Sequence, residues 1–301
     1  MVNRSLKVGL YLIPYQCLTP QNTQRQHAAL LIDTNREVSE LSYIIISLIK
    51  RPTSSKGIYD ENSIHSIVDS APVLHVSFIP GALDDDPFPA ILPMIGCTAA
   101  FSHSNSQETP ATAIYLHGHI SSRLIKLPNS SDQDNDHLPG SPVCIAATHV
   151  DGLVLAVSPF NHSCNYRSAI IHGWANIVTD PAEKLYALER ITNNVVSNRW
   201  ENTLPTTDAD LKSTGVLRVD IASASAKVRA GGPGEDHGDK EKRERVWLGV
   251  VPCWMAYGKP VPSGQNQVQE VPEYIANWVS EENERNQVYA VQVASQTYGK
   301  K

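Results

Sequence analysis

The chain has 301 residues, of which 41% are hydrophobic and 19% are charged, so it is long and apolar enough to bury a core. No uncharged apolar run approaches the roughly 18 residues that a membrane-spanning helix needs, which excludes an integral membrane protein of that kind. The 25 basic residues stand against 31 acidic ones, for a net charge of −6, and no basic stripe favours a nucleic-acid partner.

The first 57 residues are an N-terminal extension whose fold the sequence leaves open. The apolar run at residues 43–49 fits a strand or a turn of buried helix equally well, because so short a run has no distinctive period. Residues 51–57 combine Pro, Ser and Gly in the manner of a linker. Pro14 interrupts the early apolar stretch and no small-residue cleavage site follows it, so we expect no signal peptide.

From residue 58 onward the pattern predicts short helices and strands. Asp60 or Asn62 is placed to cap a helix whose apolar residues recur with the helical period. These apolar residues are Ile64, Ile67 and Val68. Strands are then expected at residues 73–79, 91–95 and 114–117, the last of them ended by Gly118.

The clearest β pattern lies between residues 142 and 178. Two β-like runs, at residues 142–149 and 153–158, are separated by the pair Asp151-Gly152. This pair is typical of the tight turn in a hairpin, so we predict that the two runs form one. Another strand is expected at residues 168–178, interrupted by Gly173 and Trp174.

The sequence predicts a helix after Asp180, with Pro181 in its first turn. Its expected apolar face consists of Leu185, Leu188, Ile191 and Val195. Further strands are predicted at residues 216–221 and 246–251, and a short helix at residues 271–279. Nine of the eleven residues at 235–245 are charged with mixed sign, which indicates a solvated loop between those strands.

Short strands at close intervals, with only occasional helices, favour a small antiparallel barrel over a doubly wound sheet. We therefore expect a mainly β fold with flanking helices, divided into an extension (1–57), a barrel (58–262) and a C-terminal tail with a short helix (263–301). The motifs G-x-G-x-x-G, Walker A, G-x-S-x-G and H-E-x-x-H are missing. The five cysteines are scattered and lack a C-x-x-C pattern, so neither a zinc site nor a disulfide framework is expected, and a reducing, cytoplasmic compartment is favoured.

The segment HGHISSRLIK, residues 117–126, combines the groups that a phosphate requires. Ser121 stands where a helix N-cap would, and Ser122 adds a second hydroxyl near the helix start. Arg123 supplies a planar fork of donors, and Lys126 follows on the same helix face. The alternative interpretation is an ordinary serine-capped helix with exposed basic residues.

Two further segments contain polar clusters. His162 and His172 lack a third ligand at usable spacing, so no metal site is expected, and Ser163 with His162 and Asp151 lacks the motif of a hydrolase. Lys227 and Arg229 are two residues apart, so an extended chain would direct both to one side, toward an anion. The same pair could instead protect the edge of a sheet.

In this order the segments resemble the FMN-binding split-barrel family related to pyridoxamine 5′-phosphate oxidase. The likeness covers residues 58–262 and is greatest to the branch of flavin-nucleotide-binding or nitroimidazole-resistance-like proteins, in its fungal form. The segments that carry it are PFPAILPMIG (87–96), YLHGHISSRLIK (115–126), PVCIAATHVDGLVLAVSPFNHSCNYRSAIIHG (142–173), SAKVRAGGP (225–233) and VWLGVVP (246–252).

The resemblance implies a six-stranded antiparallel Greek-key barrel that forms a homodimer, with FMN in the clefts between the subunits. It places the FMN phosphate and ribityl chain against Ser121, Ser122, Arg123 and Lys126. It places the isoalloxazine ring along the strand that contains Pro93, Met94 and Ile95. It completes the pocket, from the neighbouring subunit, with Asn165, Tyr166, Arg167 and Ser168. It puts a C-terminal segment near the flavin or the substrate, with Lys227, Arg229 and Trp247.

The expected function is therefore an FMN-dependent oxidoreductase that acts on a small organic substrate, in fungal specialised metabolism on the family interpretation. The alternative is a flavin-nucleotide-binding protein without turnover of its own. No side chain stands out as general acid or base, and His117, His119 and Tyr166 are the candidates. The arginine-rich C-terminal signature of pyridoxamine phosphate oxidases is missing after residue 263, so vitamin B6 oxidation is not expected.

Overall fold

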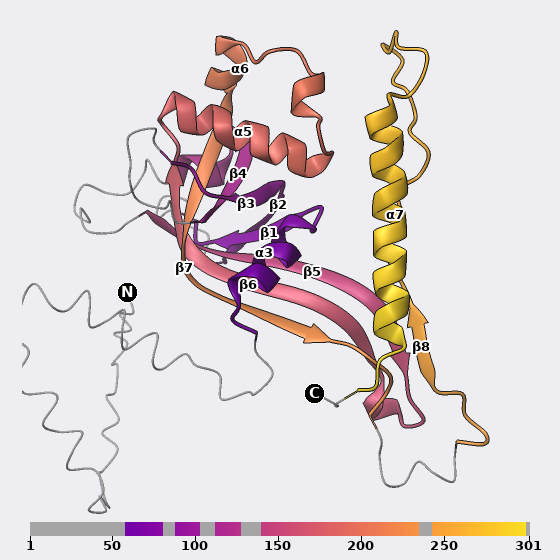
Figure 1. Cartoon of the computed structure of the whole chain (residues 1–301). Helices are drawn as coiled ribbons and strands as arrows, with labels where there is room; N and C mark the ends of the chain where they lie inside the picture. The colour runs from indigo at the N-terminus through magenta and orange to yellow at the C-terminus, as the bar shows by residue number, and fades with distance from the viewer. Residues whose placement is uncertain (1–57, 81–87, 103–111, 128–139, 235–242, 299–301) are drawn as a thin grey trace, which may run out of the picture. The chain divides into compact units, whose positions relative to one another are not determined.

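The computed structural model describes residues 58–80, 88–102, 112–127, 140–234 and 243–298 (Figure 1). All of them belong to one compact unit, Ser55–Lys301. The predictions for residues 1–57 and for most of the charged loop, residues 235–242, fall outside the described residues. No helix in the described ranges is long and apolar enough to cross a membrane.

One antiparallel sheet of eight strands dominates the described part of the chain, and this confirms the predicted mainly β fold with flanking helices. The strand order is β2-β1-β5-β6-β7-β4-β3, and β8 pairs with β5 outside that path. The strands are β1 (Leu74–Phe78), β2 (Ala90–Met94), β3 (Gly96–Ala99), β4 (Ala113–His119), β5 (Ser141–Leu155), β6 (Ser163–Ile177), β7 (Thr214–Arg229) and β8 (Gly249–Pro252). The predicted number of six strands is wrong. β3 follows β2 as a separate strand, and β8 is a further strand that pairs with β5.

The sheet closes on itself through the short link between β2 and β3. Ile95 alone separates the two strands, yet β2 pairs with β1 while β3 pairs with β4, at the opposite end of the strand order. Gly96 makes this change of partner possible, since a Cβ atom there would lie 2.6 Å from both the Leu116 side chain and the Tyr115 carbonyl oxygen. The result is a barrel from which the longer strands continue.

The predicted hairpin at Asp151-Gly152 is wrong. β5 is one strand of 15 residues that runs straight through this pair, and its pairing with β6 shifts register between Val150 and Gly152. The pair therefore forms a β-bulge, in which Asp151 is buried and Gly152 lies against β8. A Cβ atom on Gly152 would lie 2.9 Å from the Val250 side chain, so close packing, and not a turn, explains this glycine.

Two apolar clusters occupy the two faces of the barrel wall. Alternate residues of β4 show this clearly: Ile114 and Leu116 face the interior, whereas Tyr115 faces outward beneath a helix. That helix is α5 (Pro181–Val195), and its N-cap Asp180 accepts a hydrogen bond from Ala182 N at 3.0 Å. Leu188 and Ile191 of its predicted apolar face are buried, while Leu185 and Val195 are exposed.

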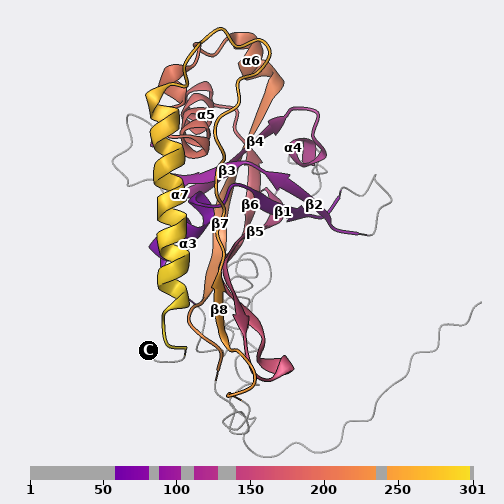
Figure 2. The same ribbon diagram turned by 90° about the vertical axis from the view of Figure 1, so that its right-hand side faces the viewer.

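The remaining α-helices are α3 (Glu61–Asp69), α4 (Arg123–Lys126), α6 (Asp208–Ser213) and α7 (Glu273–Ala294), and two short 3-10 helices are η5 (Pro159–Asn161) and η6 (Trp200–Asn202). Helix α3 confirms the prediction, with Asp60 as its cap and the three expected apolar residues buried, so Asn62 is not the cap. Helix α7 has 22 residues and is far longer than the short helix predicted at 271–279. It lies beside the long strands that leave the barrel, as Figures 1 and 2 show. The sequence of α7 has no strong apolar stripe, and only Ala290 and Val293 of this helix are buried.

Candidate functional site

The polar turn around α4 brings together four of the predicted site residues. Strand β4 continues through Gly118 to His119, so the prediction that it ends at Gly118 is wrong. The sequence predicted Ser121 as the N-cap of α4, but the N-cap residue is Ser122, and its side chain makes no capping hydrogen bond. Ser121 instead lies beside His119, with its hydroxyl 2.6 Å and its amide nitrogen 3.1 Å from His119 Nδ1.

Two buried aliphatic residues hold this turn against the barrel. Leu124 and Ile125 are almost fully buried in the interior cluster, whereas Arg123 and Lys126 are exposed. The Arg123 guanidinium lies 5.8 Å from the centre of the Phe78 ring, at the end of β1. The turn therefore presents two hydroxyls and two cationic side chains on a fixed base. This set of donors is chemically suited to a phosphate group.

The end of β2 lies next to the same turn. Met94 is buried, and its Cε atom would lie 3.5 Å from a Cβ atom placed on Gly118. Pro93 and Ile95, its two neighbours, are exposed. The structure therefore brings together two of the predicted groups, the strand around Met94 and the turn at α4.

The predicted block on β6 is divided between the two faces of the sheet. Tyr166 and Ser168 point to the outer face, where they meet Lys227 of β7. Ser168 Oγ donates to the Lys227 carbonyl oxygen at 3.4 Å, and Lys227 Nζ lies 5.9 Å from the centre of the Tyr166 ring. These three residues form the outer-face group.

Arg229 is bound within its own segment. Its Nη1 donates to Asn165 Oδ1 at 2.5 Å and to the Gly231 carbonyl oxygen at 3.1 Å, and its Nη2 donates to the Gly232 carbonyl oxygen at 3.0 Å. The guanidinium also lies 4.5 Å from the centre of the Tyr298 ring. Of the pair predicted to hold an anion, Lys227 is therefore the residue with an exposed side chain.

Asn165 is fully buried, yet its Nδ2 has no hydrogen-bond partner among the described residues. A buried donor without an acceptor costs about 1–3 kcal/mol, so such a group calls for an acceptor from a ligand or another molecule. The Nδ1 atom of His117, one of the candidate acid–base residues, is also buried without a partner in the described ranges. Both positions are compatible with a bound ligand that carries polar atoms.

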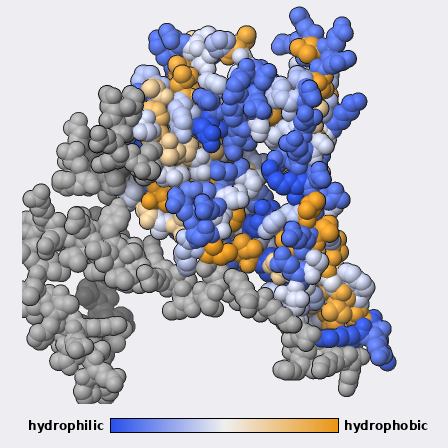
Figure 3. Space-filling model, in the orientation of Figure 1, coloured by the Kyte–Doolittle hydropathy of each residue, from blue (hydrophilic) through white to orange (hydrophobic). Residues whose placement is uncertain are grey.

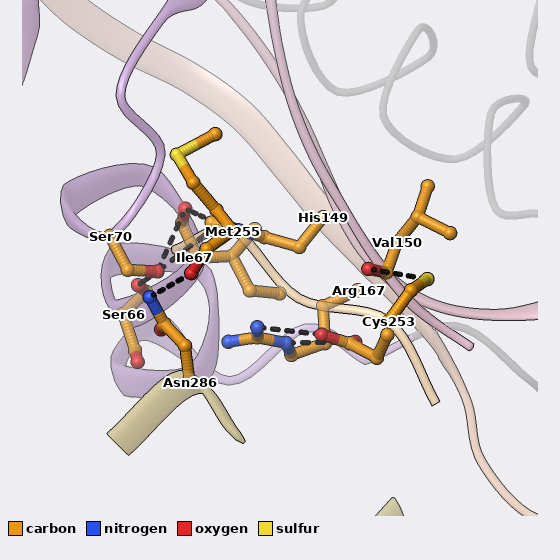
Figure 4. A network of polar contacts seen from close by, with 10 residues as sticks. Ser66, Ile67, Ser70, His149, Val150, Arg167, Cys253, Met255 and Asn286 are labelled. Carbon is orange, nitrogen blue, oxygen red and sulfur yellow. Dashed lines mark hydrogen bonds and ion pairs between the residues drawn. The ribbon is translucent and has the colours of Figure 1, made fainter. Parts of the chain in front are cut away.

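Arg167 takes part in a contact that the sequence analysis missed. Its Nε and Nη2 donate to the two carboxylate oxygens of Asp151 at 3.0 and 2.8 Å (Figure 4). The guanidinium also lies 4.1 Å from the centre of the Tyr289 ring on α7. Nearby, burial and the positive charge of Arg167 lower the pKa of His149, whose Nε2 lies 3.2 Å from both Ser70 Oγ and the Ile67 carbonyl oxygen. The Asp151 carboxylate belongs to the bulge, so the pair Asp151-Gly152 was the available sequence signal for this contact. The sequence analysis interpreted that pair as a turn.

The other predicted positions are not joined to these groups. Trp247 is exposed and covers Gly249, at the start of β8, where a Cβ atom would lie 2.8 Å from the indole ring. His162 Nδ1 lies 3.2 Å from the carbonyl oxygens of Ser158 and Pro159, so it does not form a triad with Asp151. Within the described ranges, no three His, Cys, Asp or Glu residues are grouped as a metal site would need.

Comparison with known proteins supports the resemblance inferred from the segments. Residues 60–228 match the family described as pyridoxamine 5′-phosphate oxidase, a range that includes the α4 turn and the outer-face group. Among solved structures, the flavocytochrome Anf3 from Azotobacter vinelandii is similar at 27% identity and a TM-score of 0.56, over 74% of this chain and 91% of that one. The FAD and heme binding protein from Mycobacterium smegmatis shares the fold, at 22% identity and a TM-score of 0.59, over 75% of this chain and 98% of that one. No curated protein matches the chain.

Proposed function

Because the chain belongs to the pyridoxamine 5′-phosphate oxidase family, we propose that it binds FMN and acts as an FMN-dependent oxidoreductase on a small organic substrate. The observation that carries the proposal is the α4 turn, which lies within the matched residues and presents two serine hydroxyls and two exposed cationic side chains on a buried base. The flavocytochrome relative, whose name indicates a flavin, adds support. When bound, the flavin supplies hydride or electron transfer, and the protein binds and orients it.

The phosphate of the flavin is held, on this proposal, by the hydroxyls of Ser121 and Ser122 and by the cations Arg123 and Lys126. Arginine suits this role because its planar fork donates two parallel hydrogen bonds to phosphate oxygens. The exposed edge at Pro93 and Ile95, beside the same turn, is the proposed support for the ring. Lys227, in the outer-face group, adds a positive charge that would stabilise a reduced, anionic flavin.

A homodimer is part of the proposal, because no contact joins the α4 turn to the outer-face group within the described part of one chain. The outer face of β5 and β6 also exposes Val150 and Ile170, at 47% and 37% of their surface. Apolar residues next to Tyr166 and Ser168 suit a face that a second copy covers. Light scattering after size exclusion is expected to give twice the mass of the chain. A monomer that retains flavin would contradict this arrangement.

Purified protein provides the test of flavin binding. We expect a yellow sample whose absorbance shows the flavin bands, and we expect the flavin released on denaturation to co-elute with FMN. Released FAD would retain the flavoprotein assignment and overturn FMN. A sample that stays colourless after refolding with excess FMN and excess FAD would overturn the proposal altogether.

A second measurement distinguishes the oxidoreductase from the alternative, a flavin-binding protein without turnover. Anaerobic addition of NADH or NADPH is expected to bleach the flavin bands if the protein is an oxidoreductase that uses a nicotinamide donor. Dithionite, which reduces any accessible flavin, serves as the control. Suppose that dithionite bleaches the flavin bands, that neither NADH nor NADPH does, and that no candidate acceptor oxidises the reduced flavin. This result would favour the binding protein.

A further inference from the structure

A cavity of about 800 Å³ lies on the other side of β6 from the outer-face group. Its walls come from distant parts of the sequence, which are α3 with the residues after it, the link between β2 and β3, Arg167 of β6, the end of α5, and α7 with Tyr257. In Figure 3 it corresponds to the hollow between the α7 column and the body of the barrel, which is bordered mainly by hydrophilic residues. The volume falls within the usual range of small-molecule sites.

Aromatic side chains provide flat surfaces in this cavity. The rings of Tyr257 and Trp278 are 4.6 Å apart and tilted by 54°. Tyr289, one helical turn from the cavity's polar residues on α7, lies over the guanidinium of Arg167. Rings fixed in this way favour ligands with a planar, polarisable ring system.

The charged groups of the lining are already paired. Arg167 is bound by the two carboxylate oxygens of Asp151, at 2.8 and 3.0 Å, and Arg285 is bound by Glu282. The Asp69 carboxylate accepts from Thr98 N at 2.7 Å and from Thr98 Oγ1 at 2.6 Å. A charged ligand would have to compete with these partners, whereas an uncharged ligand leaves them intact.

Uncommitted polar groups remain in the lining. The hydroxyls of Ser66 and Ser197 have no partner among the described residues, and both line the cavity. Asn286 Nδ2 donates to the Met255 carbonyl oxygen at 3.2 Å, which leaves its Oδ1 as an acceptor (Figure 4).

We propose that this cavity is a second binding site, for an uncharged planar heteroaromatic molecule that carries both a hydrogen-bond donor and an acceptor. The aromatic walls bind the ring, and the serine hydroxyls and the Asn286 amide bind its polar edge. The site goes beyond the proposed flavin-phosphate site: Ile95, which we propose supports the flavin ring, also lines this cavity, whereas no lining residue belongs to the α4 turn. Its ligand reaches α7 and the Asp151–Arg167 pair without contact with the α4 turn.

Ligand-observed NMR with the full chain tests this proposal. The probes are quinolin-2-one, which is neutral with one donor and one acceptor, quinoline-2-carboxylate, which is anionic, and 2-(aminomethyl)quinoline, which is cationic. We expect saturable binding of quinolin-2-one below about 5 mM, as the efficiency of a good fragment allows, and binding of both charged probes weaker by about fivefold or more. Quenching of Trp278 fluorescence, lost in Trp278→Phe, reports the location.

Two variants fill the cavity from two of its walls. Ser66→Trp and Ser197→Trp alter exposed residues of the lining and are expected to weaken the binding of quinolin-2-one about tenfold or more. Asn62→Trp adds the same side chain to an exposed position of α3 outside the lining, and binding should stay within about twofold. Absence of saturable binding to the wild type would overturn the proposal. So would binding to both filled variants that is as tight as to the wild type, or tighter binding of a charged probe than of quinolin-2-one.

Discussion

The ion pair between Asp151 and Arg167 is predicted to be a major determinant of stability. The two side chains are only 6% and 18% exposed, and two hydrogen bonds join them. Arg167→Met leaves the Asp151 carboxylate buried without its partner, a situation that costs about 3–5 kcal/mol. It also removes the contact with the Tyr289 ring, which contributes about 0.5–2 kcal/mol. Because methionine restores part of the lost packing, we expect a decrease of about 3–5 kcal/mol in the free energy of unfolding.

Urea-induced unfolding, followed by circular dichroism, measures this change. Arg285→Met is the matched control, because Arg285 is 62% exposed and pairs with Glu282 within α7, so its loss should cost about 0.2–0.5 kcal/mol. If Arg167→Met fails to fold, the double variant Asp151→Asn/Arg167→Met, which removes the orphaned charge, should still fold. A change below about 1 kcal/mol for Arg167→Met, similar to that of the control, would refute the reasoning.

Two further predictions concern packing and pH. Gly96→Ala introduces a Cβ atom 2.6 Å from Leu116 and is expected to destabilise the barrel by about 1–3 kcal/mol, whereas Gly232→Ala, with nothing within 4 Å, should change the melting temperature little. Burial lowers the pKa of His149 below its usual 6.5, so the unfolded chain takes up a proton that the folded protein does not. Stability should therefore be complete above about pH 6.5 and decrease as the pH falls below it. His149→Gln should reduce this dependence in pH-resolved unfolding curves, and an unchanged slope would contradict it.

Local sequence signals predicted the short elements well, because caps and apolar periods act within a few residues. Asp60 and Asp180 each accept a backbone hydrogen bond at the start of the expected helix. The Asp-Gly pair misled because its usual turn depends on what surrounds it. A buried arginine partner for Asp151 and the approach of β8 to Gly152 convert the turn into a bulge, and both come from distant segments.

The candidate site also contains some residues whose grouping the sequence predicts and others whose placement depends on distant segments. Ser121 to Lys126 are adjacent in sequence, so their grouping followed directly from the residue pattern. Which face of the sheet each β6 residue occupies, and the commitment of Arg229 to Asn165, depend on strand register and on the C-terminal segment. The cavity is built from residues more than two hundred positions apart, with no pattern along the chain, so sequence analysis had no signal for it.

Titration of FMN into the flavin-free protein tests the central claim most directly. The account predicts saturable quenching of flavin fluorescence with one FMN per chain, and an affinity about tenfold or more lower for Arg123→Ala, because the phosphate loses a charge-assisted fork. Lys212→Ala, which removes an exposed cation on α6, is the control and should bind as the wild type does. Absence of binding to the wild type, or unchanged affinity in Arg123→Ala, would contradict the assignment of the α4 turn as the flavin phosphate site.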